Sequence, residues 1–130
     1  MPDILIVEDN QVNQKLIAFL LARSSYTYDI AENGAVALQK LEAQPFRLVL
    51  MDIMMPVMNG YDTTRAIRAH PALRHLPVIA LTANAMRGEE EKCRAVGCDD
   101  FIAKPYSKDV VLSAIARLLE RKPAAGAPPA

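Results

Sequence analysis

Residues 48–52 read Leu48-Val49-Leu50-Met51-Asp52, four consecutive apolar residues that end on an aspartate. Continuous apolar runs of this length are typical of strands that are buried on both faces of a parallel sheet. Three more apolar runs end on polar residues in the same way. They are ILIV at 4–7 before Glu8 and Asp9, VIAL at 78–81 before Thr82, and FIA at 101–103 before Lys104. The sequence therefore predicts a parallel sheet with polar side chains at the carboxyl ends of its strands.

Segments with helical periodicity separate these runs, and a weaker strand is expected at 28–31. The expected helices cover residues 11–22, 35–42, 61–69, 85–96 and the stretch that follows Ser107. Asn10 and Ser107 are suitable N-caps, and Gly97 suits the position after a helix. Five strand–helix units predict an α/β, flavodoxin-like (βα)5 sandwich of three layers, with parallel strands in the order 2-1-3-4-5.

Apolar residues are spaced to form stripes along two of these helices. In the helix at 11–22 the spaced positions are Val12, Leu16, Phe19, Leu20 and Arg23, most of them apolar. In the last helix they are Val110, Val111, Ala114, Ile115, Leu118 and Leu119. Such a stripe is typical of a helix that packs one face on a core.

Length and composition indicate one domain. The chain has 130 residues, of which 52% are hydrophobic, so we expect one folded domain at residues 1–122 and a tail at 123–130, PAAGAPPA, that is too low in complexity to pack. Lys+Arg and Asp+Glu both number 15, so the chain has no excess of positive charge that would favour binding to nucleic acid or to an anionic membrane.

No apolar stretch approaches the roughly 20 residues of a membrane helix, and no signal peptide is apparent, so we expect a cytoplasmic location. Cys93 and Cys98 are expected to be small, reduced, buried thiols.

The sheet order places the polar strand ends side by side. Strands 4–7 and 48–51 become neighbours, so Glu8, Asp9 and Asp52 are expected at one edge, with Thr82 and Lys104 on the next two strands. Two carboxylates 4 Å apart repel each other by about 4 kcal/mol at an effective dielectric of 20. A divalent cation relieves this repulsion, and an all-oxygen site with room for a phosphate oxygen favours Mg²⁺.

These groups suit the chemistry of phosphoryl transfer. Asp52, on the central strand, is the expected nucleophile, and its carboxylate would become an acyl phosphate. Lys104 would contact one phosphoryl oxygen and Thr82 would donate a hydrogen bond to another. No histidine follows a strand, so a general base for hydrolysis is missing and the phosphoryl group should persist.

Four motifs together resemble the receiver domain of response regulators, the CheY-like family of two-component systems. They are VEDN at 7–10, MDIMMPVMNG at 51–60, ALTANA at 80–85 and Lys104-Pro105, and the resemblance covers residues 3–120. Two longer stretches, VEDNQVNQ at 7–14 and LTANAM at 81–86, are similar to receivers of hybrid histidine kinases and to stand-alone single-domain regulators that relay phosphate. Whether this chain is such a regulator or part of a hybrid kinase stays open.

The resemblance implies a role for each site residue. Asp52 would be the phosphoacceptor; Glu8, Asp9, Asp52 and the main-chain carbonyl of Met54 would bind Mg²⁺; and Lys104 would contact the phosphoryl group. Thr82 and Phe101 would form a switch pair, in which Phe101 stands where the family often has tyrosine. The expected function is a phosphorylation-dependent signalling switch that catalyses its own phosphoryl transfer and slow autodephosphorylation and is otherwise not an enzyme.

The resemblance also implies protein partners. A histidine kinase or histidine phosphotransfer protein would donate the phosphoryl group, and a downstream protein would read the surface formed by residues 85–96, 101–103 and the helix after Ser107. The donor would dock on Gln11, Val12, Gln14, Lys15 and Tyr106.

Three alternatives fit part of the pattern. A Mg²⁺-dependent phosphatase with an aspartyl nucleophile usually has a second aspartate two residues after the first, where this chain has Met54. A nucleotide- or flavin-binding module would need a glycine-rich loop after its first strand. A receiver-like domain that is never phosphorylated would not need the complete residue set.

Overall fold

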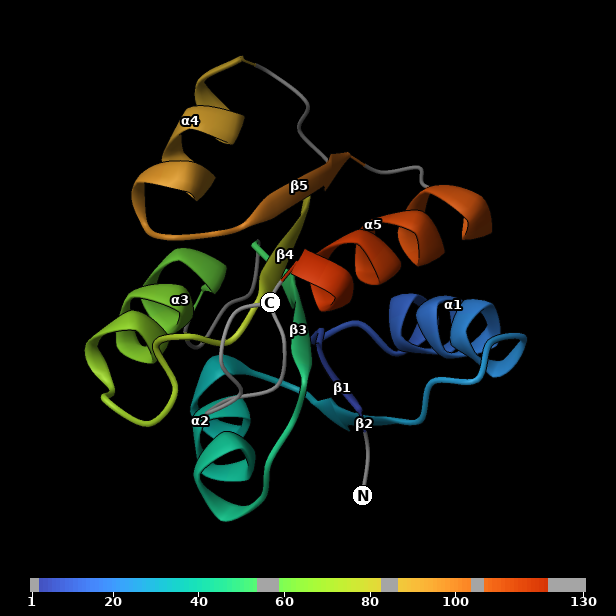
Figure 1. The fold of residues 1–130 in the computed structure, drawn as a ribbon, viewed down its shortest axis with the longest axis horizontal. Helices are drawn as coiled ribbons and strands as arrows, with labels where there is room; N and C mark the ends of the chain where they lie inside the picture. The colour runs from blue at the N-terminus through green and yellow to red at the C-terminus, as the bar shows by residue number, and fades with distance from the viewer. Residues whose placement is uncertain (1–2, 54–58, 83–86, 104–106, 122–130) are drawn as a thin grey trace.

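Strands and helices alternate along the chain (Figure 1). The computed structural model describes residues 3–53, 59–82, 87–103 and 107–121. The elements within these residues are β1 (Ile4–Val7), α1 (Gln11–Ala22), β2 (Tyr28–Ala31), α2 (Gly34–Ala43), β3 (Leu48–Asp52), α3 (Gly60–Ala69), β4 (Val78–Thr82), α4 (Arg87–Ala95), β5 (Asp100–Ala103) and α5 (Lys108–Arg121).

The strands form one parallel sheet in the order β2-β1-β3-β4-β5. This confirms the predicted order and the flavodoxin-like arrangement. β3 lies at the centre, where its whole length is buried. Val7 pairs with Met51 and Asp52 pairs with Leu81, so the strand ends that carry the polar residues lie side by side.

Helices cover both faces of the sheet and give three layers (Figure 1). On one face, Ile4 and Ile6 of β1 pack with side chains of α1 and α5. On the other face, Leu5 and Val7 of the same strand pack with side chains of α2, α3 and α4. The alternation along one strand explains why a continuous apolar run predicts a strand buried on both sides.

Side-chain caps explain where several helices begin and end. Asn10, Asn33 and Asn59 each accept hydrogen bonds from the first turn of the helix that follows, α1, α2 and α3 respectively. Ser107 Oγ accepts from the main-chain N–H of Val110 at the start of α5. Gly97 has a φ of 107° after α4, the left-handed conformation that glycine adopts at a helix end.

Part of the apolar stripe predicted for α1 is exposed, and the stripe predicted for α5 is buried or partly buried except at Val110. The α1 side chains that are buried are Ile17, Leu20 and Leu21, whereas Val12, Leu16 and Phe19 of the expected stripe are exposed. Val110 of α5 is also exposed, at 51%, because the buried stripe of this helix turns toward Val111, Ala114, Ile115 and Leu118. Three large apolar side chains of α1 therefore face away from the core.

Element bounds differ from the expected ones by one or two residues. α2 and α3 each begin on their glycine, Gly34 and Gly60, and β3 and β4 extend to the polar residues Asp52 and Thr82. α4 ends at Ala95, one residue before the expected end, and residues 85 and 86 at its expected start lie outside the described residues. Cys93 and Cys98 are buried, free thiols, as predicted. None of the described helices has the length and apolar character needed to cross a membrane.

Candidate functional site

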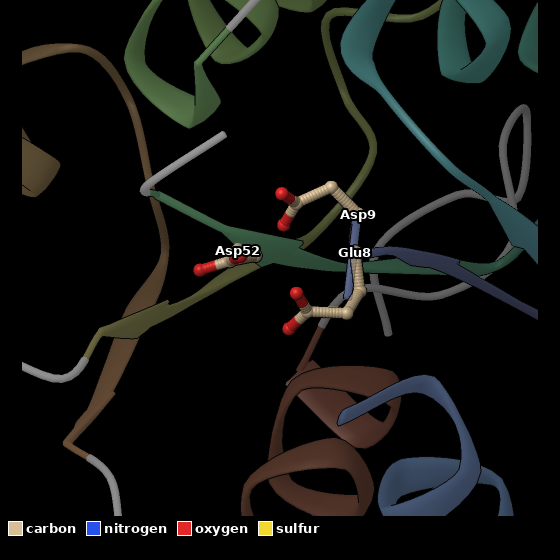
Figure 2. Close-up of side chains that lie close together, drawn as sticks. All are labelled: Glu8, Asp9 and Asp52. Carbon is tan, nitrogen blue, oxygen red and sulfur yellow. The ribbon is translucent and has the colours of Figure 1, made fainter. Parts of the chain in front are cut away.

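Three carboxylates meet at the carboxyl ends of β1 and β3. Glu8, Asp9 and Asp52 each offer one oxygen, and these three oxygens all lie within 4.8 Å of one another. Figure 2 shows the three side chains directed toward a common space. Glu8 and Asp52 are buried, whereas Asp9 is exposed. The acidic cluster predicted from the strand ends is therefore present and is reached from solvent on the side of Asp9.

Hydrogen bonds fix the segment that carries Glu8 and Asp9. The main-chain N–H of Glu8 donates to the carbonyl of Ala31 in β2 at 3.0 Å. The carboxylate oxygen Oε2 of Glu8 accepts from the N–H of Asn10 at 3.2 Å. The side chain of Asn10 in turn accepts from the N–H groups of Val12 and Asn13 at 2.9 and 3.1 Å. The short turn between β1 and α1 is thus held at both ends.

Close backbone packing fixes Asp52. The N–H of Ile53 donates to the carbonyl of Leu81 in β4 at 3.1 Å, and the N–H of Gly60 donates to the carbonyl of Ile53 at 3.0 Å. A Cβ atom at Gly60 would lie only 2.6 Å from the carbonyl oxygen of Asp52. Glycine is therefore required where α3 begins, because the helix starts directly against the peptide that follows Asp52. The sequence offered only a glycine at a helix start, and its contact with β3 was not predicted.

The cluster brings three carboxylates close together. The buried carboxylates of Glu8 and Asp52, at a separation of 4.8 Å or less, repel each other by about 3 kcal/mol or more at an effective dielectric of 20. A divalent cation bound by oxygen ligands relieves this repulsion. The donor set, three carboxylates with one side open to solvent, fits Mg²⁺ with several waters retained.

Thr82 lies on the strand next to Asp52, as predicted. It is the last residue of β4, it is fully buried, and its strand neighbour in β5 is Ala103. Its position brings a hydroxyl to the same sheet edge as the three carboxylates. The prediction that this hydroxyl binds a phosphoryl oxygen is untested.

Phe101 lies in β5, beside Ala80 of β4. Its ring is partly buried and packs against the core cluster on the α2–α3–α4 face. It also lines a shallow groove between β5 and α5, together with Val110 and Ala114. The place of Phe101 between this core cluster and the groove fits the predicted switch role, which stays a prediction.

Several predicted residues fall outside the described part of the chain. Lys104, Met54 and Tyr106 belong to this group, so the predicted phosphoryl contact, main-chain metal ligand and donor contact stay predictions. Of the donor surface, Gln11, Val12 and Lys15 are exposed on α1, as expected, and Gln14 is half-buried. Gln14 has a contact that the sequence did not predict: its side-chain amide donates to the main-chain carbonyl of Glu8 at 2.7 Å.

Most of the chain is similar in sequence to known signalling proteins. It is 42% identical over 104 residues to the polar-differentiation response regulator DivK of Brucella anthropi, covering 80% of this chain and 85% of DivK. It is 37% identical over 124 residues to hybrid signal transduction histidine kinase M of Dictyostelium discoideum, covering 92% of this chain but only 5% of the kinase. This chain therefore corresponds to a small part of that kinase and to most of DivK.

Solved structures agree in fold. The receiver domain of the sensor histidine kinase PA1611 from Pseudomonas aeruginosa, crystallised with a magnesium ion coordinated in its active-site cleft, is 40% identical with a TM-score of 0.79, covering 93% of this chain and 96% of that domain. The signal receiver domain of a histidine kinase from Syntrophus aciditrophicus is 31% identical with a TM-score of 0.87, covering 100% and 98%.

The family model of the response regulator receiver domain matches residues 4–116. This range contains all five strands and the carboxylate cluster at their ends. With the predicted sheet order also confirmed, sequence and structure agree on one conclusion. The chain belongs to the response regulator receiver domain family of two-component signalling.

Proposed function

We propose that this chain is a phosphorylation-dependent switch that accepts a phosphoryl group on Asp52. The observation that carries the proposal is the convergence of Glu8, Asp9 and Asp52 within 4.8 Å, with the buried Asp52 at the end of the central strand. Membership of a signalling family supports it. The proposal places the chain in the cytoplasm with its phosphodonor.

Glu8, Asp9 and Asp52 would hold Mg²⁺, with the carbonyl of Met54 as a further ligand by family resemblance. The ion, when bound, neutralises phosphoryl oxygens and helps to orient the group in line. The magnesium in the PA1611 receiver, a relative of 40% identity, supports this assignment. The chain's own residues supply the oxygen donors and the fixed backbone that keeps them together.

Asp52 would act as the nucleophile. One carboxylate oxygen attacks the phosphorus of a phosphohistidine, the P–N bond breaks, and its electron pair returns to the imidazole, which takes up a proton from solvent. Lys104 would balance charge on one phosphoryl oxygen, and Thr82 would donate a hydrogen bond to another. His70 and His75 lie in the connection that leads into β4. This connection is at the amino ends of the strands, opposite the site at their carboxyl ends, so neither histidine can serve as a base for hydrolysis. The acyl phosphate would therefore decay slowly.

Thr82 and Phe101 would report the phosphoryl group to the surface of α4, β5 and α5. Movement of Thr82 toward a phosphoryl oxygen leaves space into which the ring of Phe101 can turn. Because Phe101 packs on the core and also lines the groove beside α5, its rotation changes the shape of this face. A downstream protein would bind the altered face, as in other switches that read a local charge change through a two-state element.

The exposed face of α1 would receive the phosphodonor. Val12, Leu16 and Phe19 are exposed by 74%, 46% and 58%, and their spacing places them along one side of the helix. Exposed apolar side chains that line up in this way mark a protein-binding surface. A helix of a histidine kinase or phosphotransfer protein with an apolar face would pack here, close to Asp52.

The alternative of an aspartyl-nucleophile phosphatase finds no support in the comparisons. The relatives described above are response regulators and histidine kinases. The position of the second aspartate of such enzymes is Met54 here.

Intact mass after incubation with a small phosphodonor tests the proposal. We expect a Mg²⁺-dependent gain of one phosphoryl group, which Asp52→Asn abolishes. Asp62→Asn is a matched control, because Asp62 is an exposed aspartate of the following helix, paired with Arg65, and it should be labelled like the wild type. Labelling that survives Asp52→Asn, or that needs no divalent ion, would refute the proposal.

A further inference from the structure

Gln14 makes a contact with the acidic cluster from the neighbouring helix. Its side-chain nitrogen Nε2 donates to the main-chain carbonyl oxygen of Glu8 at 2.7 Å, across six residues of chain. Gln14 is half-buried, in contrast to its neighbour Lys15, which is exposed. The sequence placed Gln14 on the surface that meets the phosphodonor, but its amide group is directed to the metal-binding segment.

The Glu8 carbonyl stands at the point where the chain leaves the sheet. β1 ends at Val7, and the N–H of Glu8 still bonds to Ala31 of β2. Beyond it, the first backbone hydrogen bond of α1 runs from the N–H of Gln14 to the carbonyl of Asn10 at 2.9 Å. The side chain of Gln14 thus reaches back past its own helix to hold the peptide between Glu8 and Asp9.

Holding this peptide sets the direction of two carboxylates. The carbonyl of Glu8 and the N–H of Asp9 belong to one planar unit, so fixing the carbonyl fixes the main-chain orientation from which both side chains leave. The carboxylate of Glu8 has a second restraint, the N–H of Asn10. That of Asp9 makes no hydrogen bond or ion pair that involves the described residues. The direction of the Asp9 side chain therefore depends on its backbone.

We propose that Gln14 is a positioning residue of the metal site, which keeps the carboxylates of Glu8 and Asp9 directed at Asp52 by holding the Glu8 carbonyl. This inference rests on the proposed function, in which these three carboxylates bind Mg²⁺. Residues that orient metal ligands without touching the metal typically contribute about 10- to 100-fold to metal affinity. Gln14 does so through a main-chain atom.

Replacement of the amide by a group of similar length tests the proposal. Gln14→Met keeps the length of the side chain and a good helix former but removes the donor. Gln39→Met is the matched control, because Gln39 is an exposed glutamine of another helix, α2. We expect Gln14→Met to raise the Mg²⁺ dissociation constant about tenfold, measured from amide shifts in NMR titrations without phosphodonor. Gln39→Met should leave it unchanged.

Two further measurements separate positioning from a purely structural role. At saturating Mg²⁺ the rate of labelling of Gln14→Met should approach that of the wild type, whereas the Mg²⁺ concentration for half-maximal labelling should rise about tenfold. Combining Gln14→Met with Asp9→Asn should cost less affinity than the two single changes multiplied together, because Gln14 acts partly through Asp9. Gln14→Asn, which keeps the amide but shortens its reach, should lie between the wild type and Gln14→Met, and it serves if the latter fails to fold.

Other results would overturn the proposal. One is that both Gln14 variants bind Mg²⁺ with an affinity within twofold of the wild type. Another is that the variants lose thermal stability in the absence of Mg²⁺ but keep the Mg²⁺ affinity of the wild type. The proposal would also be contradicted if the losses of Mg²⁺ affinity caused by Gln14→Met and Asp9→Asn multiplied fully in the double variant. Failure of the wild type to become phosphorylated would refute the proposed function alone, since the affinity ratio between variants is measured without a phosphodonor.

Discussion

Helices α1 and α4 follow two strands that carry site residues, but they are attached to the sheet in different ways. α1 has 12 residues and buries Ile17, Leu20 and Leu21. α4 has nine residues, RGEEEKCRA, and Cys93 is the one side chain that is buried among those described for this helix. Because burial of apolar surface is the main source of helix stability in proteins, α1 is firmly held and α4 is not.

Polar contacts hold the two ends of α4. Near its start, the hydroxyl of Tyr61 in α3 donates to the carboxylate of Glu89. After its end, the guanidinium of Arg68 donates to the carbonyl of Gly97 and to the carboxylate of Asp99. Helices of this length are marginal in isolation, so these contacts decide how often α4 opens. The helix beside the acidic cluster is therefore fixed by its buried core residues, whereas α4 depends on a few hydrogen bonds.

Arg68→Met should give the largest change in how firmly α4 is held relative to α1. The guanidinium also donates to the carbonyl of Leu76 at 2.7 Å, and the residue is largely buried with Asp99. Loss of these bonds leaves polar groups poorly satisfied, so we expect unfolding in urea to show a loss of about 3 kcal/mol. Hydrogen exchange should accelerate more in α4 than in α1.

The matched control for this change is Arg65→Met on the same helix. Arg65 forms an exposed pair with Asp62, which is worth less than about 1 kcal/mol. Equal acceleration of exchange in α1 and α4 of the Arg68 variant would show that the loss is global and would remove the distinction between the two helices.

Alkaline pH should weaken the α3–α4 contact next. Burial raises the pKa of the Cys98 thiol to about 12, and the neighbouring Cys93 adds to the shift. Burial is also the main cause of the raised pKa of Cys93 and Tyr61, and Glu89 contributes to both. Below the ordinary thiol pKa of 9.0 both the folded and the unfolded chain keep the proton. Above it the unfolded chain ionises first, so stability falls as pH rises.

At pH 10 the contribution of Cys98 to this loss is about 1 kcal/mol, from the linkage between protonation and folding. Urea unfolding at pH 8 and pH 10 measures the difference, and Cys98→Ala should reduce it. A pH dependence that is the same in wild type and variant would assign the alkaline loss to other groups.

The outline of the fold and the acidic cluster could be predicted from sequence because both depend on local patterns. Apolar runs such as residues 48–51 are buried on both faces of the sheet, and parallel strands bring their polar ends to one edge. The buried face of α1 could not be predicted in this way, because the apolar stripe of this helix includes Val12 and Phe19, which are exposed. Periodicity identifies a helix, but an apolar surface for a partner has the same period as one for the core.

The contacts that hold the site could not be predicted in the same way. Gly60 meets the carbonyl of Asp52, and Gln14 meets the carbonyl of Glu8. In both pairs the partner is a main-chain atom, which every residue has, so no pairing of side-chain types marks the contact. Such roles depend on how the helices pack on the strand ends.

Gly88→Ala should give the smallest effect, and in the opposite direction. Gly88 lies in the first turn of α4, its φ is not positive, and a Cβ atom there would meet nothing within 4 Å. Alanine therefore fits without strain, and the lower backbone entropy of the unfolded chain should stabilise α4 by about 0.5–1 kcal/mol. Hydrogen exchange should slow in α4 and stay unchanged in α1.

The same variant tests whether the weak attachment of α4 matters for signalling. If phosphorylation acts by moving α4, a helix made more stable should respond less, so the exchange difference between phosphorylated and unphosphorylated protein should shrink in Gly88→Ala. Glu91→Ala, a change from an exposed α4 residue to alanine, is the control for altered surface composition. An unchanged difference in Gly88→Ala would mean that α4 moves as an intact helix, and that the number of contacts holding its ends matters more than its own stability.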